Sequence, residues 1–227
     1  MTDLDAVIGA RLARMARHKA RMAQTPSLSD ASPMGSGPLN RHGMPRLPPG
    51  QTETRKWPVL DLGIHPVIRE ADWSLTVDGA VQQPLRLDWP GFLELPQVED
   101  TSDFHCVTTW SQMDLCFRGV RLSTVLALAD LRDDASHLLC HGSDGYTVNI
   151  PLEEALKDDV LIAFQVGGQP LPREHGGPAR IVTPQLWAWK GAKWVSRLQV
   201  LTEDRRGFWE ERGYSNTAYP WRDDRYG

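Results

Sequence analysis

Cysteine is scarce in this chain of 227 residues, and its three cysteines, Cys106, Cys116 and Cys140, lie far apart. They form no C-x-x-C pair and no H-x-x-H pair accompanies them, so their spacing disfavours a structural zinc site. An odd number of cysteines without a framework also argues against a disulfide scaffold and favours a reducing compartment. Each cysteine therefore has to be interpreted on its own surroundings.

Long apolar runs are also missing, because no stretch is long enough to span a bilayer. The opening sequence MTDLDAVIGARLARMARHKARM has neither a hydrophobic signal core nor paired arginines, so we expect a cytoplasmic protein. The chain has no G-x-G-x-x-G after a strand, no Walker motif and no C-x-x-C-H motif. Nicotinamide, nucleotide and covalent haem binding are therefore disfavoured.

The residues that are present are typical of a globular protein. Hydrophobic residues make up 41% of the chain and charged residues 24%. The length allows a sizeable core in one or two domains. The net charge of −4 argues against a general nucleic-acid binder, so we predict no nucleic-acid partner.

Charge is distributed unevenly along the chain. Residues 1–56 carry nine Lys or Arg against four Asp or Glu, which marks them as distinct from the acidic remainder. Within residues 4–22, apolar side chains recur at helical spacing opposite arginines, which predicts a basic amphipathic helix. This helix is either a solvated extension or a docking element for an acidic partner, another subunit or an anionic membrane surface. Residues 25–50, rich in Pro, Gly and Ser, are predicted to be a linker or a strap over the surface.

The central part of the sequence predicts short strands mixed with short helices. Strands are expected at 73–79, 85–89, 137–140, 146–151 and 160–166, and helical segments at 89–95, 122–129 and 152–156. We expect Ser123 to open the second helical segment. Because strands and helices do not alternate regularly, the pattern favours an α+β fold over a doubly wound sheet.

The segment 101–120, TSDFHCVTTWSQMDLCFRGV, carries the most distinctive chemistry. A β-patterned run reaches Phe104 and is followed by an irregular, aromatic-lined loop that contains Cys106. The thiol has three interpretations. It is a buried structural side chain, a nucleophile, or a ligand to a metal whose other ligands come from a cofactor. His105 is poorly placed to activate Cys106, because adjacent strand residues point to opposite faces.

The sequence HCVTTWS, followed by RGV and a leucine-rich helix, resembles the cysteine loop of the sulfite oxidase family of molybdenum enzymes. The likeness extends from about Leu47 to about Asn216. It implies a mixed domain of several β-sheets with peripheral short helices, in which Cys106 coordinates molybdenum beside the dithiolene sulfurs of molybdopterin. The position before the cysteine, where an arginine is common in the family, is His105 here. This difference weakens a sulfite assignment and leaves a sulfoxide or another small oxygen-atom donor open.

Two later motifs match the same family in the same order. In PREHGGPAR, glycines allow close backbone approach, and His175 and Arg180 offer a neutral donor and a cation; alone, such a histidine is usually a turn residue. In WAWKGAKW, Lys190 and Lys193 lie three apart, and on a helical turn both would face one anion. Two solvated lysines are the plainer interpretation. The resemblance assigns cofactor contacts to His175, Arg180, Gly191, Ala192 and Lys193.

Further positions are implied by the resemblance alone. Leu60 and Asp61, from a segment that runs past the pterin in relatives, and Ser143 and His105 are assigned to the cofactor. Tyr146 is assigned to the catalytic pocket together with Cys106. A strand with a capping aspartate, a turn serine and a half-buried strand tyrosine would explain the same residues without function.

The resulting hypothesis is a molybdenum–molybdopterin oxidoreductase that transfers an oxygen atom in a two-electron reaction on a small sulfite-like or sulfoxide-like substrate. Residues 1–46 would form the basic extension and linker, 47–203 the molybdopterin-binding catalytic domain, and 204–227 an aromatic tail that packs on the domain or across a subunit interface. An external electron donor or acceptor protein would be needed, and homo-oligomerisation stays open. The alternative is a pterin or anion binding module without turnover; a thiol hydrolase lacks a triad.

Overall fold

A computed structural model of the chain describes residues 6, 8–13, 16 and 32–227. Most of the helix predicted for residues 4–22 lies outside these residues, but 8–13 are helical. Ile8 is buried there, and Arg11 donates hydrogen bonds to the Leu128 carbonyl and to Gln83 Oε1. None of the described helices is long and apolar enough to cross a membrane.

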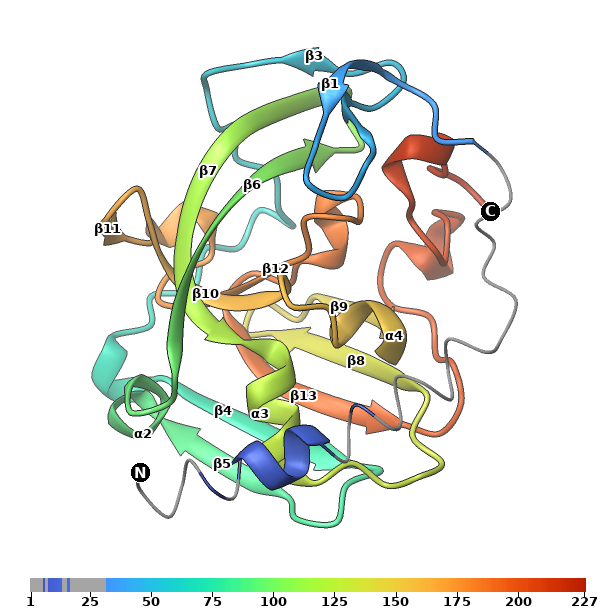
Figure 1. Cartoon of the computed structure of the whole chain (residues 1–227). Helices are drawn as coiled ribbons and strands as arrows, with labels where there is room; N and C mark the ends of the chain where they lie inside the picture. Colours follow the sequence, from blue (N-terminus) through green and yellow to red (C-terminus); the bar gives the residue numbers. More distant parts are fainter. Residues whose placement is uncertain (1–5, 7, 14–15, 17–31) are drawn as a thin grey trace.

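Two sheets form the body of the described structure (Figure 1). The first, six-stranded sheet has the order β11-β10-β7-β3, with β12 paired to β10 and β6 paired to β7. Its strands are β3 (Thr52–Glu53), β6 (Gln97–Cys106), β7 (Trp110–Arg121), β10 (Leu161–Val166), β11 (Gln169–Pro170) and β12 (Arg180–Val182). The second, five-stranded sheet has the order β5-β4-β13-β8-β9, from β4 (Ser74–Gly79), β5 (Leu85–Asp88), β8 (His137–Gly142), β9 (Thr147–Pro151) and β13 (Val195–Leu201).

The helices are short and surround the sheets. Beyond the helical residues 8–13, residues 32–227 contain α2 (Trp89–Leu93), α3 (Leu122–Ala129) and α4 (Leu152–Ala155), with the 3₁₀ turns η1 (Glu70–Asp72), η2 (Arg173–His175), η3 (Ala188–Lys190), η4 (Glu210–Arg212) and η5 (Pro220–Arg222). One hydrophobic core joins the two sheets, with Val120 and Ile162 from the first sheet, Leu75 and Leu198 from the second, and Val125 from α3. The predicted α+β fold class is confirmed.

The region around Cys106 differs from the expected irregular loop. Strand β6 continues to Cys106, which pairs with Trp110 at the start of β7, so a three-residue turn closes a long hairpin. The alternation that would predict this hairpin is broken by a register shift between Ser102 and Phe104 and by Asp114, whose φ is +55°. The prediction of a loop from Phe104 onward was therefore wrong.

Helix α3 has the predicted bounds but not the predicted cap. Its N-cap residue is Arg121, which makes no side-chain capping bond, and Ser123 lies inside the helix and is buried. The Leu122 amide donates instead to the carbonyl of Val160, so the neighbouring segment satisfies the helix start.

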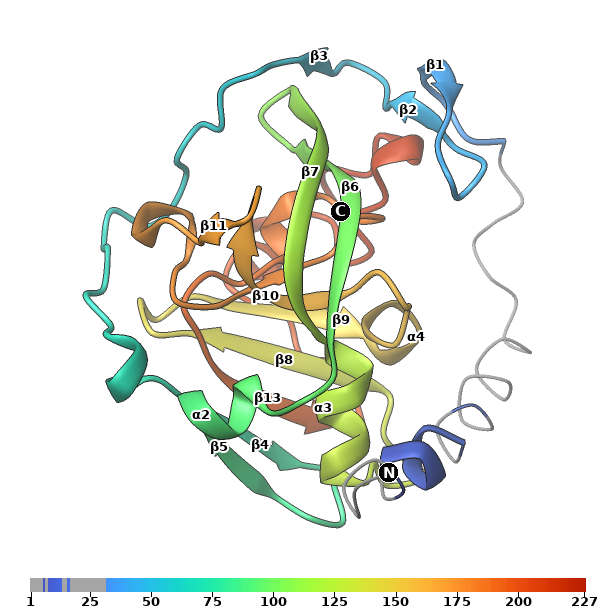
Figure 2. The same ribbon diagram turned by 60° about the vertical axis from the view of Figure 1, so that its left-hand side comes forward.

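The predicted linker contains a second hairpin, formed by β1 (Ser36–Leu39) and β2 (Pro45–Leu47). Its turn is held by Asn40, whose side chain accepts hydrogen bonds from the His42 and Met44 amides. Figure 2 shows this hairpin beside the closed end of the β6–β7 hairpin, where Arg46 pairs with Asp103 at 2.5 Å. Segment 25–50 is thus partly regular, because an Asx turn supplies the order that periodicity did not indicate.

Candidate active site

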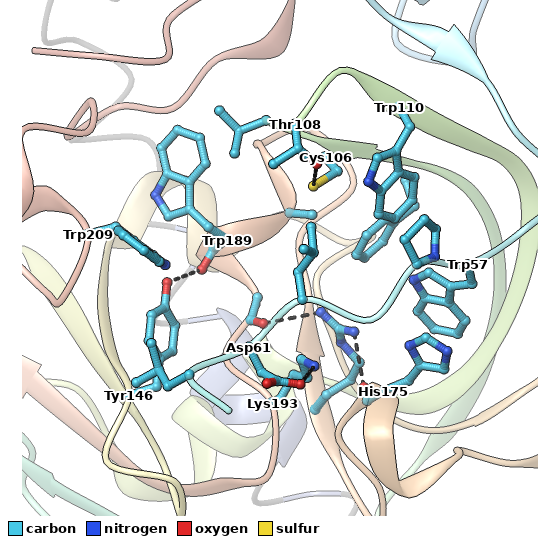
Figure 3. Close-up of a pocket in the computed structure, with 18 of the residues that line it drawn as sticks. Trp57, Asp61, Cys106, Thr108, Trp110, Tyr146, His175, Trp189, Lys193 and Trp209 are labelled. Carbon is cyan, nitrogen blue, oxygen red and sulfur yellow. Dashed lines mark hydrogen bonds and ion pairs between the residues drawn. The ribbon is translucent and has the colours of Figure 1, made fainter. Parts of the chain in front are cut away.

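A cavity of about 360 Å³ opens beside the end of β6. Cys106 and Thr108 lie at one end of it and Asp61 and Lys193 at the other, with aromatic side chains on both sides (Figure 3). Its lining includes Trp57, Leu60, Asp61, Cys106, Thr108, Trp110, Asp144, Tyr146, His175, Arg180, Trp189, Gly191, Lys193, Trp209 and Tyr214. The cavity therefore draws together segments from 57 to 214.

Cys106 is buried, with 7% of its surface exposed, yet its side chain lines the cavity. Its Sγ lies 3.1 Å from Thr108 Oγ1 in the turn that follows. Burial raises the pKa of the thiol above its ordinary value, while hydrogen bonds from Thr108 and the charges of Arg225 and Arg180 oppose this rise. A sulfur at the wall of a cavity, near two guanidinium groups, suits a thiolate that is stabilised by binding a positive centre.

His105 lies on the opposite face of β6, as the strand geometry predicts. Its Nδ1 lies 2.8 Å from Ser111 Oγ, and Ser111 donates to Gln51 Oε1, so His105 Nδ1 carries the proton in this chain of hydrogen bonds. Burial lowers the pKa of His105 to about 4. His105 borders a separate hollow behind the strand and does not reach Cys106, so the structure places no base beside the thiol from this position.

Arg180, from β12, is the most heavily buried cation of the cavity wall, with 3% of its surface exposed. Its guanidinium donates to the carbonyls of His175, Gly191 and Ile181, at 3.0 to 3.3 Å, and none of the described carboxylates forms an ion pair with it. Burial lowers its pKa to about 10. A buried positive charge without a carboxylate would be stabilised by an anion bound in the cavity.

His175 ends η2, in the loop that leads into β12. Its ring is stacked on Trp57, with ring centroids 3.9 Å apart. Burial and the neighbouring charges of Arg180 and Lys193 lower its pKa to about 4, so the ring is neutral at physiological pH. Glycine is required at Gly176, where φ is +105° and a Cβ would meet Lys193 at 2.9 Å. The loop therefore brings His175, Arg180 and Lys193 into one wall.

Lys193 lies at the far end of the cavity from Cys106. Its Nζ is 3.2 Å from Asp61 Oδ2 and donates to the Glu174 carbonyl at 2.7 Å. Asp61 also contacts His65 Nε2 at 2.6 Å. Burial acts to raise the pKa of Asp61, but the Gly63 amide and Lys193 outweigh it and keep that pKa below its ordinary value. The Lys193 ammonium lies at the edge of the cavity, where it can bind an anionic group in addition to Asp61.

Lys190 contradicts the prediction that both lysines face one anion. It ends η3, is fully buried, and pairs with the equally buried Glu210 at 2.7 Å, on the other side of the segment from Lys193. Asn149 accepts two further hydrogen bonds from its Nζ. The helical turn stops at Lys190, so the two lysines do not share a face.

The remaining predicted residues divide into two groups. Leu60, Asp61, Tyr146 and Gly191 line the cavity together with those above, and Tyr146 donates to the Trp189 carbonyl at 2.7 Å. His105, Ser143 and Ala192 do not line it. The Ser143 hydroxyl donates to the Trp194 carbonyl in a turn, and its neighbour Asp144 takes the place at the cavity wall. The Gly191 amide donates to the Ala188 carbonyl at 3.1 Å.

Several lining residues were not predicted: Trp57, Thr108, Asp144, Trp189, Trp209 and Tyr214. Trp189 donates to Glu210 at 2.9 Å, and Trp209 and Tyr214 pack together with centroids 5.0 Å apart. The aromatic richness of the tail was visible in the sequence, but its position beside Cys106 follows from long-range packing that no local pattern indicates.

Comparison with known proteins decides the family. The chain matches the family model of the oxidoreductase molybdopterin binding domain over residues 62–209. The chain belongs to this family. Its members are molybdopterin oxidoreductases, so the resemblance inferred from the cysteine loop is confirmed.

Similar proteins match this chain over different fractions of its length. The uncharacterized oxidoreductase YuiH of Bacillus subtilis (strain 168) is 37% identical over 182 residues, 80% of this chain and 92% of that protein. Mitochondrial sulfite oxidase of Rattus norvegicus is 38% identical over 106 residues, 42% of this chain but 19% of that enzyme. The protein-methionine-sulfoxide reductase catalytic subunit MsrP of Gluconobacter oxydans (strain 621H) is 29% identical over 155 residues, 60% of this chain and 49% of that subunit.

Among solved structures, the sulfane dehydrogenase SoxCD from Paracoccus pantotrophus is similar in fold to this chain. It has a TM-score of 0.57 and 26% sequence identity, and it covers 61% of this chain and 40% of that one. The described residues of this chain contain no group of three or more His, Cys, Asp or Glu side chains that could hold a metal ion.

Proposed function

We propose that this protein is a molybdenum–molybdopterin oxidoreductase that carries out two-electron oxygen-atom transfer on a small substrate. The observation that carries the proposal is the polarity of the cavity. A cysteine thiol lies at one end, an ammonium at the other, and the buried Arg180 forms no ion pair with the described carboxylates (Figure 3). An elongated, anionic cofactor with a metal at one end and a phosphate at the other suits this arrangement.

The donor set fits this cofactor. Cys106 would supply a thiolate to the metal, which is the ligand type that soft metal centres prefer. Arg180 and Lys193 would hold the anionic parts, and His175 with Leu60 and Asp61 would border the pterin. Gly191 lets the cavity wall pack closely on β12, since a Cβ there would meet the Ile181 carbonyl oxygen at 2.4 Å. When bound, the cofactor supplies the two-electron redox chemistry, and the chain supplies position and charge.

The lining of the cavity and the two characterised relatives bear on the substrate class. Tyr146 and the aromatic groups of Trp189, Trp209 and Tyr214 border the cavity, so a small molecule that enters beside Cys106 meets mainly apolar walls. Similarity to a sulfite oxidase and to a methionine sulfoxide reductase supports both a sulfite-like and a sulfoxide-like substrate. The reaction also needs a separate electron donor or acceptor, which we propose is a protein met in the cytoplasm.

Replacement of Cys106 by serine tests the proposal. In protein produced in a host that makes molybdopterin, we expect wild type to contain about one molybdenum per chain and to reduce or oxidise its substrate with a dye as electron partner. Cys106→Ser should keep the fold and much of the pterin, measured as the fluorescence of its oxidised form, but lose turnover by at least about 10²-fold.

Cys116→Ser is the matched control, because Cys116 is a partly buried cysteine of β7 that does not line the cavity. It should retain metal and activity. Full activity of Cys106→Ser would show that the assignment of the metal ligand is wrong. Pterin without molybdenum and without dye-linked activity in wild type would favour the binding-module alternative.

A further inference from the structure

The turn that follows Cys106 is held in an unfavourable backbone conformation. Thr109 has a φ of +75°, in the left-handed region that β-branched residues rarely adopt. Its amide donates to the Cys106 carbonyl at 3.2 Å, and Thr108 places its hydroxyl 3.1 Å from the Cys106 sulfur. Such a turn persists only where its surroundings hold it, so the direction of the sulfur depends on what contacts residues 107–109.

Two contacts from distant parts of the chain hold this turn. On one side the Thr52 amide, in β3, donates to the Thr109 carbonyl at 2.9 Å. On the other side the Arg225 guanidinium donates through Nη1 to the Val107 carbonyl. The second nitrogen of the same guanidinium, Nη2, donates to the Pro49 carbonyl at 3.2 Å, just before β3. Arg225 therefore connects both strand β3 and the Cys106 turn to the C-terminal segment.

Arg225 is itself well fixed for this task. Its guanidinium lies over the ring of the fully buried Trp187, 4.5 Å from the ring centroid, and its Nε contacts Asp223 at 2.6 Å. The side chain is 12% exposed. A planar guanidinium can serve two carbonyls and a ring face together, whereas an ammonium is a compact point charge without a planar face.

We propose that Arg225 is a positioning residue that holds the 107–109 turn in its strained conformation and so keeps the Cys106 sulfur directed into the cavity. The consequence for the metal rests on the function proposed above. Arg225 does not line the cavity; besides the charge that it places near Cys106, it acts through the Val107 carbonyl.

Hydrogen exchange of the full-length protein tests the contact without reference to turnover. In Arg225→Gln, the amides of Thr109 and Thr52 should exchange about tenfold faster than in wild type, because the turn loses a charge-assisted hydrogen bond. Arg225→Lys should give an intermediate rate and serves if the glutamine variant folds poorly. Arg222→Gln is the matched control, since Arg222 is a cation of the same segment that lies over Tyr219; it should exchange like wild type.

The second measurement uses the cofactor-loaded protein. The electron paramagnetic resonance signal of the one-electron-reduced metal should broaden or shift in Arg225→Gln, recover partly in Arg225→Lys, and stay unchanged in Arg222→Gln. Wild-type exchange at Thr109 in Arg225→Gln, or equal acceleration in both glutamine variants, would overturn the proposal. If wild type held no metal, the proposed function would fail while the exchange data still decided the role of Arg225.

Discussion

Two lysines three residues apart show how far the surroundings of a residue decide its role. Lys193 lies at the cavity rim, where Asp61 is its partner, while Lys190 is fully buried against Glu210. Burial lowers the pKa of both ammonium groups. A fully buried ion pair gains little over apolar packing but is costly to break, because the remaining charge has lost its partner.

We predict that Lys190 and Glu210 are strongly coupled in their effect on the free energy of unfolding. Lys190→Met should lower the free energy of unfolding by about 3–5 kcal/mol, since Glu210 would remain buried without its cation. Glu210→Gln should cost a similar amount. The double variant should lose clearly less than the sum of the two, which urea unfolding of all four proteins measures. Additive losses would show that the pair does not act as a unit.

The sequence predicted single residues best where their chemistry was unusual. Cys106, His175, Arg180 and Lys193 were found because a thiol, a glycine-rich loop and a lysine-containing motif stand out in the sequence, and the structure brings all four to one cavity. The position of Lys190 was predicted wrongly, because spacing along the chain does not say where a short 3₁₀ turn ends. Ser143 does not line the cavity, and its neighbour Asp144 does.

Among the elements, the β6–β7 hairpin contributes the sulfur to the site. It carries Cys106 at one end, and at the other Gly119 lies against β10, where a Cβ would meet the Ile162 carbonyl oxygen at 2.3 Å. The sequence predicted the short strands of the second sheet but not β13, because a register shift between Val195 and Arg197 interrupts its alternation. The β6–β7 hairpin and strand β13 both depend on long-range pairing, which local sequence patterns do not contain.

We predict that Gly119→Ala destabilises the protein by about 3 kcal/mol, because the new methyl group would force β7 and β10 apart. Gly145→Ala is the comparison: its φ is +86°, but a Cβ there has no atom within 4 Å, so about 1 kcal/mol is expected. Thermal unfolding of both variants distinguishes contact from backbone conformation. Equal losses would contradict the contact argument.

The whole molecule encloses its cavity by returning the C-terminal segment to the N-terminal half. Figure 1 shows the C-terminal segment near the β1–β2 hairpin. Trp221 donates to the Pro45 carbonyl and the Met34 amide donates to the Trp221 carbonyl, while Trp209 and Tyr214 contribute to the cavity wall. The tail is therefore structural as well as part of the site.

Deletion of residues 204–227 should prevent folding, because it removes two lining aromatics and leaves Lys190 buried without Glu210, a loss of about 3–5 kcal/mol from the ion pair alone. Deletion of 226–227 should be tolerated, since Tyr226 is 69% exposed. Soluble yield and circular dichroism melting compare the two. A stable, cooperatively melting 1–203 fragment would contradict the structural role of the tail.

The order in which the chain is synthesised gives the enclosed cavity a further consequence. Trp209 and Tyr214 leave the ribosome long after Cys106, which precedes both by more than 100 residues. During that interval the thiol and the buried side of Arg180 have no complete pocket around them. A complete pocket for the proposed cofactor would thus exist only after residues 204–227 have been synthesised and have folded back onto the domain.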